Sequence, residues 1–411
     1  MLNGSATSAA LRHRTVLALG VGAALGVPSI AVRAQKRYDP GATDTEIKVG
    51  QTMPYSGPAS AYGTIGRVEA AYFKKVNDEG GVNGRKINFV SLDDGYSPPK
   101  TVEVTRRLVE QEEVLLVFNG LGTPPNTAIH NYMNAKKVPQ LFVATGATKW
   151  NDPQGHPWTM GWQPNYQTEA KIYARYIVKT RPNAKVAVLF QNDDYGKDYL
   201  KGFKDGFGAQ ARLIVGEASY EVTDPTVDSQ VLQLQGSGAD TFFNITTPKF
   251  AAQALRKAWD SGWKPLHFLN NVSASVGSVL TPAGLDKCVD VVSSSYGKDP
   301  TDPQWANDAG LKDWQAFMKK YYPEGSLTDA FNVYGYSVAM TLVQVLKQCG
   351  DNLTRENVMR QAASLKNFVT PMALPGIAID TSPTDFAPIE QMQLMKFDGK
   401  TWVLFGDVMS A

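Results

Sequence analysis

Short apolar runs alternate along the chain with segments that repeat apolar residues at helical spacing. The runs are KINFVSLDD (86–94), VLLVFNG (114–120), VAVLFQND (186–193) and TFFNITT (241–247), and each ends in polar residues or glycine. The helical segments between them carry Ile65, Val68, Tyr72 and Val76, and later Phe250, Ala254, Leu255, Ala258 and Trp259. This repetition of strand, helix and strand predicts parallel sheets covered by helices on both faces.

The segments that follow strand-like runs are the first places to look for a site, because ligands of doubly wound sheets lie beyond the carboxyl ends of the strands. They are MPYSGPASAYG (53–63), NGLGTPPN (119–126), FVATGATKW (142–150), QNDDYG (191–196), ITTPK (245–249) and NNVSA (270–274). Hydroxyl, amide and glycine residues dominate them, and charges are few. Such residues favour binding through hydrogen bonds over acid–base catalysis.

The first residues have the layout of a secretory signal peptide. In LRHRTVLALGVGAALGVPSIAVRAQ (11–35), a basic start precedes an apolar middle, and small residues precede Gln35. A membrane anchor is the alternative, but the apolar run is short and interrupted by Pro28. We therefore expect residues 1–34 to be removed by cleavage after Ala34, which would place the protein in the periplasm.

Charge and length narrow the class of protein further. The formal net charge is +2, and Arg12, Arg14 and Arg33 belong to the expected leader. A near-neutral chain is a poor partner for nucleic acid or a membrane surface, since both need a basic excess. The 411 residues are enough for two well-filled cores.

The two cysteines, Cys288 and Cys349, leave two alternatives open. Export permits a disulfide between them, whereas two separate thiols would behave as small apolar residues. Their spacing matches no metal or redox motif.

The sequence carries few of the motifs that mark an enzyme. No H-E-x-x-H, G-x-S-x-G, phosphate loop or G-x-G-x-x-G accompanies the strands. The acidic pairs Asp93-Asp94 and Asp193-Asp194 could hold a metal or act as acid and base, but both follow strands, where Asp commonly caps the next helix or turn. We predict a binding protein without catalytic residues, metal or cofactor.

Five segments carry a resemblance to a known family. They are SGPASAYG (56–63), NDEGGVNGRKINFVSLDDGYSP (77–98), VPQLFVATGAT (138–148), NDDYGKDYLKGF (192–203) and GYSVAMTLVQVLK (335–347). In this order, behind a signal peptide, they resemble the periplasmic leucine/isoleucine/valine-binding proteins, the type I substrate-binding components of ABC importers. The resemblance covers nearly the whole chain after the leader.

The resemblance implies an α/β fold of two Rossmann-like, doubly wound lobes joined by a three-crossing hinge. Lobe one would comprise residues 39–162 and 294–368, and lobe two residues 163–293 and 369–411. A small molecule would be enclosed in the cleft when the lobes close. The implied partners are this ligand and the permease subunits of an ABC transporter, and the protein itself would be a monomer.

The resemblance also implies the ligand-binding residues. Tyr62 would contact the ligand, and Thr123 with the loop Ala144-Thr145-Gly146 would hold a carboxylate. Tyr195 would pack against the ligand, Phe331 would touch its apolar end, and Trp162 would roof the cleft. Three of these residues have a structural alternative: Thr123 as a helix cap, Tyr195 as support for its own loop, and Phe331 as ordinary core.

Two positions depart from the family pattern. Amino-acid binders of this family place an acidic residue where this chain has Asn271, and usually a Tyr where it has Thr247. A buried ammonium without a carboxylate partner would lose several kcal/mol. We therefore expect a carboxylate-bearing solute without an amino group, such as an aromatic or other organic acid, or an amide-like compound. A branched-chain or other hydrophobic amino acid is the alternative.

Overall fold

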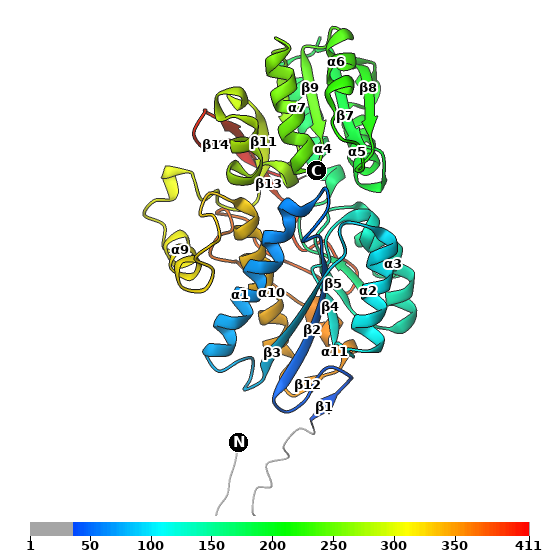
Figure 1. Ribbon diagram of the computed structural model, residues 1–411, viewed down its shortest axis with the longest axis vertical. Helices are drawn as coiled ribbons and strands as arrows, with labels where there is room; N and C mark the ends of the chain where they lie inside the picture. The colour runs from blue at the N-terminus through cyan, green and yellow to red at the C-terminus, as the bar shows by residue number, and fades with distance from the viewer. Residues whose placement is uncertain (1–35, 411) are drawn as a thin grey trace, which may run out of the picture. The chain divides into compact units, whose positions relative to one another are not determined.

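Two open sheets organise residues 36–410, which are the residues that the computed structural model describes. The first has five parallel strands in the order β3-β2-β4-β5-β6, and the second has seven in the order β14-β13-β11-β10-β9-β7-β8 (Figure 1). A short parallel pair, β1 with β12, completes the strands. The signal peptide expected over residues 1–34 lies outside the described residues.

The strands are β1 (Arg37–Tyr38), β2 (Glu46–Met53), β3 (Lys86–Asp93), β4 (Leu116–Phe118), β5 (Gln140–Val143), β6 (Thr159–Gly161), β7 (Val186–Gln191), β8 (Ile214–Tyr220), β9 (Thr241–Ile245), β10 (Leu266–Leu269), β11 (Val292–Ser295), β12 (Asn352–Leu353), β13 (Met392–Phe397) and β14 (Trp402–Met409). The α-helices are α1 (Gly63–Asp78), α2 (Pro98–Glu110), α3 (Thr123–Lys136), α4 (Tyr166–Thr180), α5 (Asp194–Phe207), α6 (Asp228–Gly236), α7 (Pro248–Asp260), α8 (Thr281–Ala283), α9 (Ala309–Tyr321), α10 (Ala330–Cys349) and α11 (Arg355–Ala362). All four apolar runs singled out in the sequence contain strands, namely β3, β4, β7 and β9.

Helices cover both faces of the first sheet. In Figure 1, α1 and α10 lie on one side of β2 to β5, and α2 and α3 lie on the other. The predicted apolar face of α1 (Ile65, Val68, Tyr72 and Val76) is buried. The second helical prediction, α7, is correct except for Trp259, which is 39% exposed.

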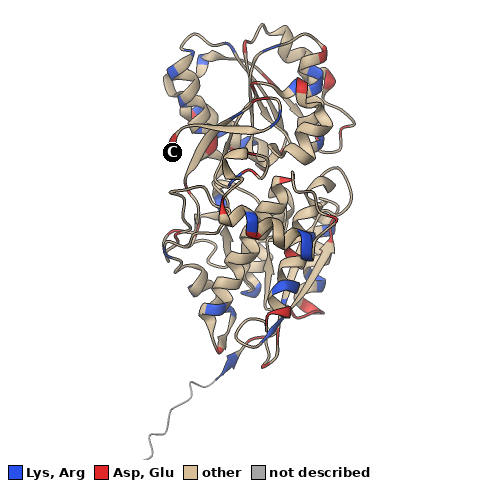
Figure 2. Cartoon of the chain, turned by 90° about the vertical axis from the view of Figure 1, so that its left-hand side faces the viewer, with Lys and Arg blue, Asp and Glu red and all other residues tan. Residues whose placement is uncertain are grey.

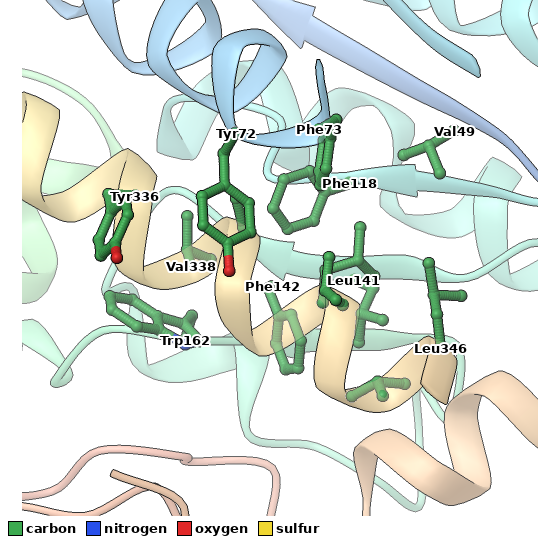
Figure 3. Packing of buried hydrophobic residues seen from close by; sticks show 14 of the residues in the cluster. Val49, Tyr72, Phe73, Phe118, Leu141, Phe142, Trp162, Tyr336, Val338 and Leu346 are labelled. Atoms are coloured by element: carbon green, nitrogen blue, oxygen red, sulfur yellow. The ribbon is translucent and has the colours of Figure 1, made fainter. Parts of the chain in front are cut away.

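The core of the first sheet is built by aromatic and aliphatic side chains from distant parts of the chain. Tyr72 and Phe73 of α1 meet Phe118 of β4 and Tyr336 of α10 (Figure 3). The rings of Tyr72 and Tyr336 meet edge to face with centroids 5.2 Å apart. Helix α10 therefore belongs to the first sheet although its start, Ala330, lies 168 residues after Trp162, which directly follows the last strand, β6.

The chain passes between the two sheets three times, after β6, after β11 and between α11 and β13. The predicted fold class, two doubly wound α/β lobes with a three-crossing hinge, is confirmed. The residues at which each lobe begins and ends stay predictions. One expectation needs correction: the second sheet is mixed, because β13 pairs antiparallel with both β11 and β14.

The acidic pairs have structural roles in the described residues. Asp193 caps α5 by accepting the backbone N–H groups of Tyr195 and Gly196. Asp93 accepts from the backbone N–H and the hydroxyl of Ser56. These contacts support the interpretation of both pairs as cap and turn residues.

The described residues also show how the charges are distributed and which alternative holds for the two thiols. Lys, Arg, Asp and Glu are interspersed over helices and loops, as Figure 2 shows. Cys288 and Cys349 are both free and buried, which decides for two separate thiols, and burial raises the pKa of each to about 12. From residue 36 to 410, no helix is both long and apolar enough to cross a membrane.

Candidate functional site

A cavity lies where the carboxyl ends of the parallel strands of both sheets meet. Most of the ligand-binding residues predicted from the sequence line it: Tyr62, Thr123, Ala144, Trp162, Tyr195, Thr247, Asn271 and Phe331. The first seven of these follow strands β2, β4, β5, β6, β7, β9 and β10, while Phe331 begins the buried face of α10. Parallel strands place their carboxyl ends at one edge of a sheet, which explains why segments so far apart in sequence converge.

Thr145 and Gly146 do not line the cavity but support its wall. The Thr145 hydroxyl lies 2.6 Å from that of Thr123 and accepts a hydrogen bond from the Tyr166 hydroxyl. A Cβ at Gly146 would lie 2.5 Å from the carbonyl oxygen of Pro164. Contact of these two residues with a ligand therefore stays a prediction, and in the structure the Thr145 hydroxyl contacts that of Thr123.

The backbone around Thr123 offers few free hydrogen-bond donors. The N–H groups of Ala144 and Thr145 donate to Gly120 and Val143. Pro124 and Pro125 carry no N–H, so Thr123 supplies the backbone donor of the first three residues of α3. Gly122 occupies the cap position, which removes the interpretation of Thr123 as a helix cap.

Aromatic rings form much of the wall. The rings of Tyr62 and Phe331 lie 5.0 Å apart, and the Trp162 ring meets Tyr334 edge to face at 5.2 Å. The Tyr195 hydroxyl accepts a hydrogen bond from the Asn270 amide, so this ring is held at the cavity by the residue that follows β10, two strands away from β7 in the sheet. Such a wall suits a ligand with a planar or apolar body.

Four tyrosines of the lining were missed as ligand residues: Tyr96, Tyr166, Tyr296 and Tyr334. Tyr96 follows β3 in the family-like segment DDGYSP, and this position was its available signal. Its backbone is left-handed, with φ of 60°, and its ring lies against Gly122, where a Cβ would come within 2.4 Å of it. Tyr296 and Tyr334 carry no sequence pattern that separates them from core residues.

Asn271 is held in place by groups behind the cavity. Its side-chain amide donates to the carbonyl oxygen of Ser294, and its backbone N–H donates to a Glu169 carboxyl oxygen at 2.7 Å. Glu169 also accepts hydrogen bonds from the hydroxyls of Tyr199 and Tyr173, at 2.7 and 2.8 Å. Asn271 thus presents a fixed neutral group, and the nearby carboxyl of Glu169 is occupied by protein donors.

The charged side chains on the lining are Lys298 and Asp299. The Lys298 ammonium pairs with Asp308 at 2.8 Å and donates to the carbonyl oxygen of Pro371 at 2.9 Å. Asp299 accepts from the backbone and hydroxyl of Thr301, and burial raises its pKa to about 6 despite these bonds. Both charges are therefore partnered within the protein. From residue 36 to 410, no three His, Cys, Asp or Glu residues are grouped to hold a metal ion.

Residues 46–401 match the model of the periplasmic binding protein family. The chain belongs to this family. Its similarity to leucine/isoleucine/valine-binding proteins is also confirmed, because it is 24% identical to the Leu/Ile/Val-binding protein homolog 1 of Brucella suis, over 77% of this chain and 82% of that one. It is likewise 24% identical to an amino acid binding protein of Pseudomonas aeruginosa, over 83% and 86% of the two chains.

Solved structures of the family share the fold. A branched chain amino acid ABC transporter protein from Thermus thermophilus with bound valine superposes with a TM-score of 0.80 at 17% identity, covering 89% of this chain and 97% of that one. A fatty acid ABC transporter substrate-binding protein from Thermomonospora curvata gives 0.76 at 21% identity, covering 92% and 95%. Members of the family are periplasmic proteins that bind small molecules for ABC transporters, and it is not an enzyme family.

The buried carboxyl of Glu169 predicts that the stability of this protein depends on pH. Burial raises its pKa to about 7, against the hydrogen bonds from Tyr199, Tyr173 and Asn271 that lower it. The folded protein therefore holds a proton that the unfolded chain releases near its ordinary pKa of about 4.3, so stability falls as pH rises from about 5 to 8.

The free energy of unfolding is expected to fall by about 3 kcal/mol less between pH 5 and pH 8 in Glu169→Gln, because Gln cannot ionise. Urea unfolding of both proteins at pH 5 and pH 8 measures the difference between the two slopes. Other buried carboxyls keep their contributions in both proteins, so they cancel in the comparison. Equal slopes would mean that Glu169 does not titrate in this range.

Proposed function

We propose that the protein captures an aromatic or other apolar organic acid in the periplasm and delivers it to the permease of an ABC importer. The observation that carries this proposal is the neutral, fixed Asn271 at the position where family members that bind amino acids place an acid. The names of the related proteins span amino acids and fatty acids, so they do not choose between solute classes.

The polar end of such a ligand is expected at Thr123. The hydroxyl and backbone N–H of Thr123, with the hydroxyl of Tyr96, are neutral groups of the kind that bind a carboxylate through hydrogen bonds. The aromatic wall around Phe331 and Trp162 would take the apolar body. An α-ammonium would meet the Asn271 amide, whose nitrogen already donates to Ser294.

Delivery is proposed to follow closure of the two lobes. Contacts between segments of the two sheets support this mechanism: the Tyr62 hydroxyl donates to Val272 at 2.9 Å, and Lys149 pairs with Asp194 at 2.6 Å. Recognition of the closed, monomeric protein by permease subunits is part of the same proposal.

One observation favours the alternative, a hydrophobic amino acid. Asp299 is a buried carboxyl on the cavity wall, 9% exposed, and the nearby acids Asp302 and Asp329 raise its pKa further. An arriving ammonium would relieve this accumulation of negative charge. Asp299 would then replace the missing acid at position 271.

A matched titration distinguishes an organic acid from an amino acid as the ligand. Calorimetry would compare 3-phenylpropanoate with phenylalanine, and 4-methylpentanoate with leucine, since the members of each pair differ only in the amino group. We expect each acid to bind at least about tenfold more tightly than its amino acid, because an unpaired buried ammonium costs more than 1.4 kcal/mol. 3-Phenylpropanamide tests the need for the carboxylate.

Tighter binding of the amino acids would contradict the proposed solute class and support the alternative. Asp299→Asn should then remove that preference. The family assignment would stand in either case.

A further inference from the structure

The cavity has an aliphatic end that the aromatic wall does not explain. The segment between α11 and β13 forms neither helix nor strand, yet it places Met372, Ile377, Ile379 and Ile389 on the lining. All four are buried, with exposures of 1 to 4%. They add an aliphatic surface to a lining that also holds the rings of Tyr62 and Phe331.

The same segment lines a second hollow of about 420 Å³. Five residues border both spaces: Lys298, Thr370, Ala373, Ile377 and Ala378. Residues 370–378 are therefore a wall one chain thick between the ligand cavity and the second hollow.

Hydrogen bonds fix one half of this wall. Lys298 N–H donates to Met372 at 2.8 Å, and Leu374 N–H donates to Tyr296 at 3.0 Å. The chain then turns at the exposed Pro375 and Gly376, where φ of Gly376 is 85°. The two alanines that border both spaces flank this turn and are each partly exposed. Ala373 and Ala378 have the smallest side chains among the five residues that border both spaces, and these side chains are apolar.

We propose that the site takes a carboxylic acid whose apolar tail is longer than an amino-acid side chain, with the tail passing between Ala373 and Ala378 into the second hollow. This inference rests on the proposed function, because it takes the carboxylate end to lie at Thr123. A tail on this path runs from Phe331 along Met372 and Ile377 before it reaches the two alanines.

A chain-length series tests the path. Calorimetry with straight-chain acids of four, six, eight and ten carbons should show binding that tightens about fourfold for each added methylene, the equivalent of about 0.8 kcal/mol. Ala378→Phe narrows the passage. It should abolish the gain from six to ten carbons. Urea unfolding of the variant shows separately that it is folded.

Ala387→Phe is the matched control, because Ala387 is partly exposed in the same irregular segment and lines neither space. It should bind the whole series as the wild type does. Affinity independent of chain length, or equal weakening of all acids by Ala378→Phe, would overturn the inference while leaving the proposed function intact. If no acid binds but the amino acids do, the proposed solute class fails and this inference fails with it.

Discussion

Asn271→Glu is expected to weaken binding of 3-phenylpropanoate by about 100-fold, because it adds a negative charge on the cavity wall beside a ligand that carries one. The structure sharpens this expectation. A carboxylate at position 271 would lose the donor to Ser294 and would stand close to the carboxyl of Glu169, which binds the backbone N–H of Asn271. The substitution is therefore expected to weaken ligand binding and also to destabilise the loop that carries residue 271.

Asn271→Gln provides the matched control, since Gln has the length of Glu and keeps the amide. Calorimetry of both variants with 3-phenylpropanoate and phenylalanine separates charge from size. We expect the ratio of the two affinities to shift toward phenylalanine in the Glu variant alone, because the new carboxylate supplies a partner for the ammonium. Equal losses in the two variants would show that length, not charge, decides at this position.

Gly122→Ala is expected to lower the free energy of unfolding by about 2 to 4 kcal/mol and to abolish binding. Two costs add. The backbone of Gly122 has φ of 98° and ψ of 143°, which residues with a Cβ rarely adopt. A Cβ there would also come within 2.4 Å of the Tyr96 ring, which lines the cavity. The ring would have to move into the space meant for the ligand.

Gly84→Ala separates these two costs. Gly84 has φ of 83°, but no atom lies within 4 Å of the place where its Cβ would be. This variant should lose about 1 kcal/mol and bind as the wild type does. Urea unfolding and calorimetry on both variants measure the excess due to Tyr96. The same loss in both would mean that the ring of Tyr96 accommodates the methyl group without consequence.

The candidate site could be predicted as far as it follows from the order of the elements. Tyr62, Thr123, Tyr195 and Asn271 each lie in a segment that the sequence predicted to follow a strand. Once the sheets are parallel, the ends of those strands must share an edge. The departure at Asn271 was also visible, because residue type at a known position needs no coordinates.

The sequence by itself determined the local structure. The period of the apolar residues set α1 and α7, the strand-length runs set β3, β4, β7 and β9, and polar caps such as Asp193 fixed where helices begin. These outcomes depend on neighbours a few residues apart, for which a local pattern carries the physical information. The family resemblance added how the two lobes connect.

Only the tertiary structure decided which of the remaining side chains share a space. Tyr296 and Tyr334 reach the cavity because separate passages of the chain meet there, and the irregular residues 370–378 become its wall through bonds to residues 296–298. Thr145 stands behind Thr123, and Glu169 stands behind Asn271, 102 residues away. No periodic signal marks such contacts, because they arise from packing between elements that are remote in sequence, and each depends on geometry that the complete fold supplies.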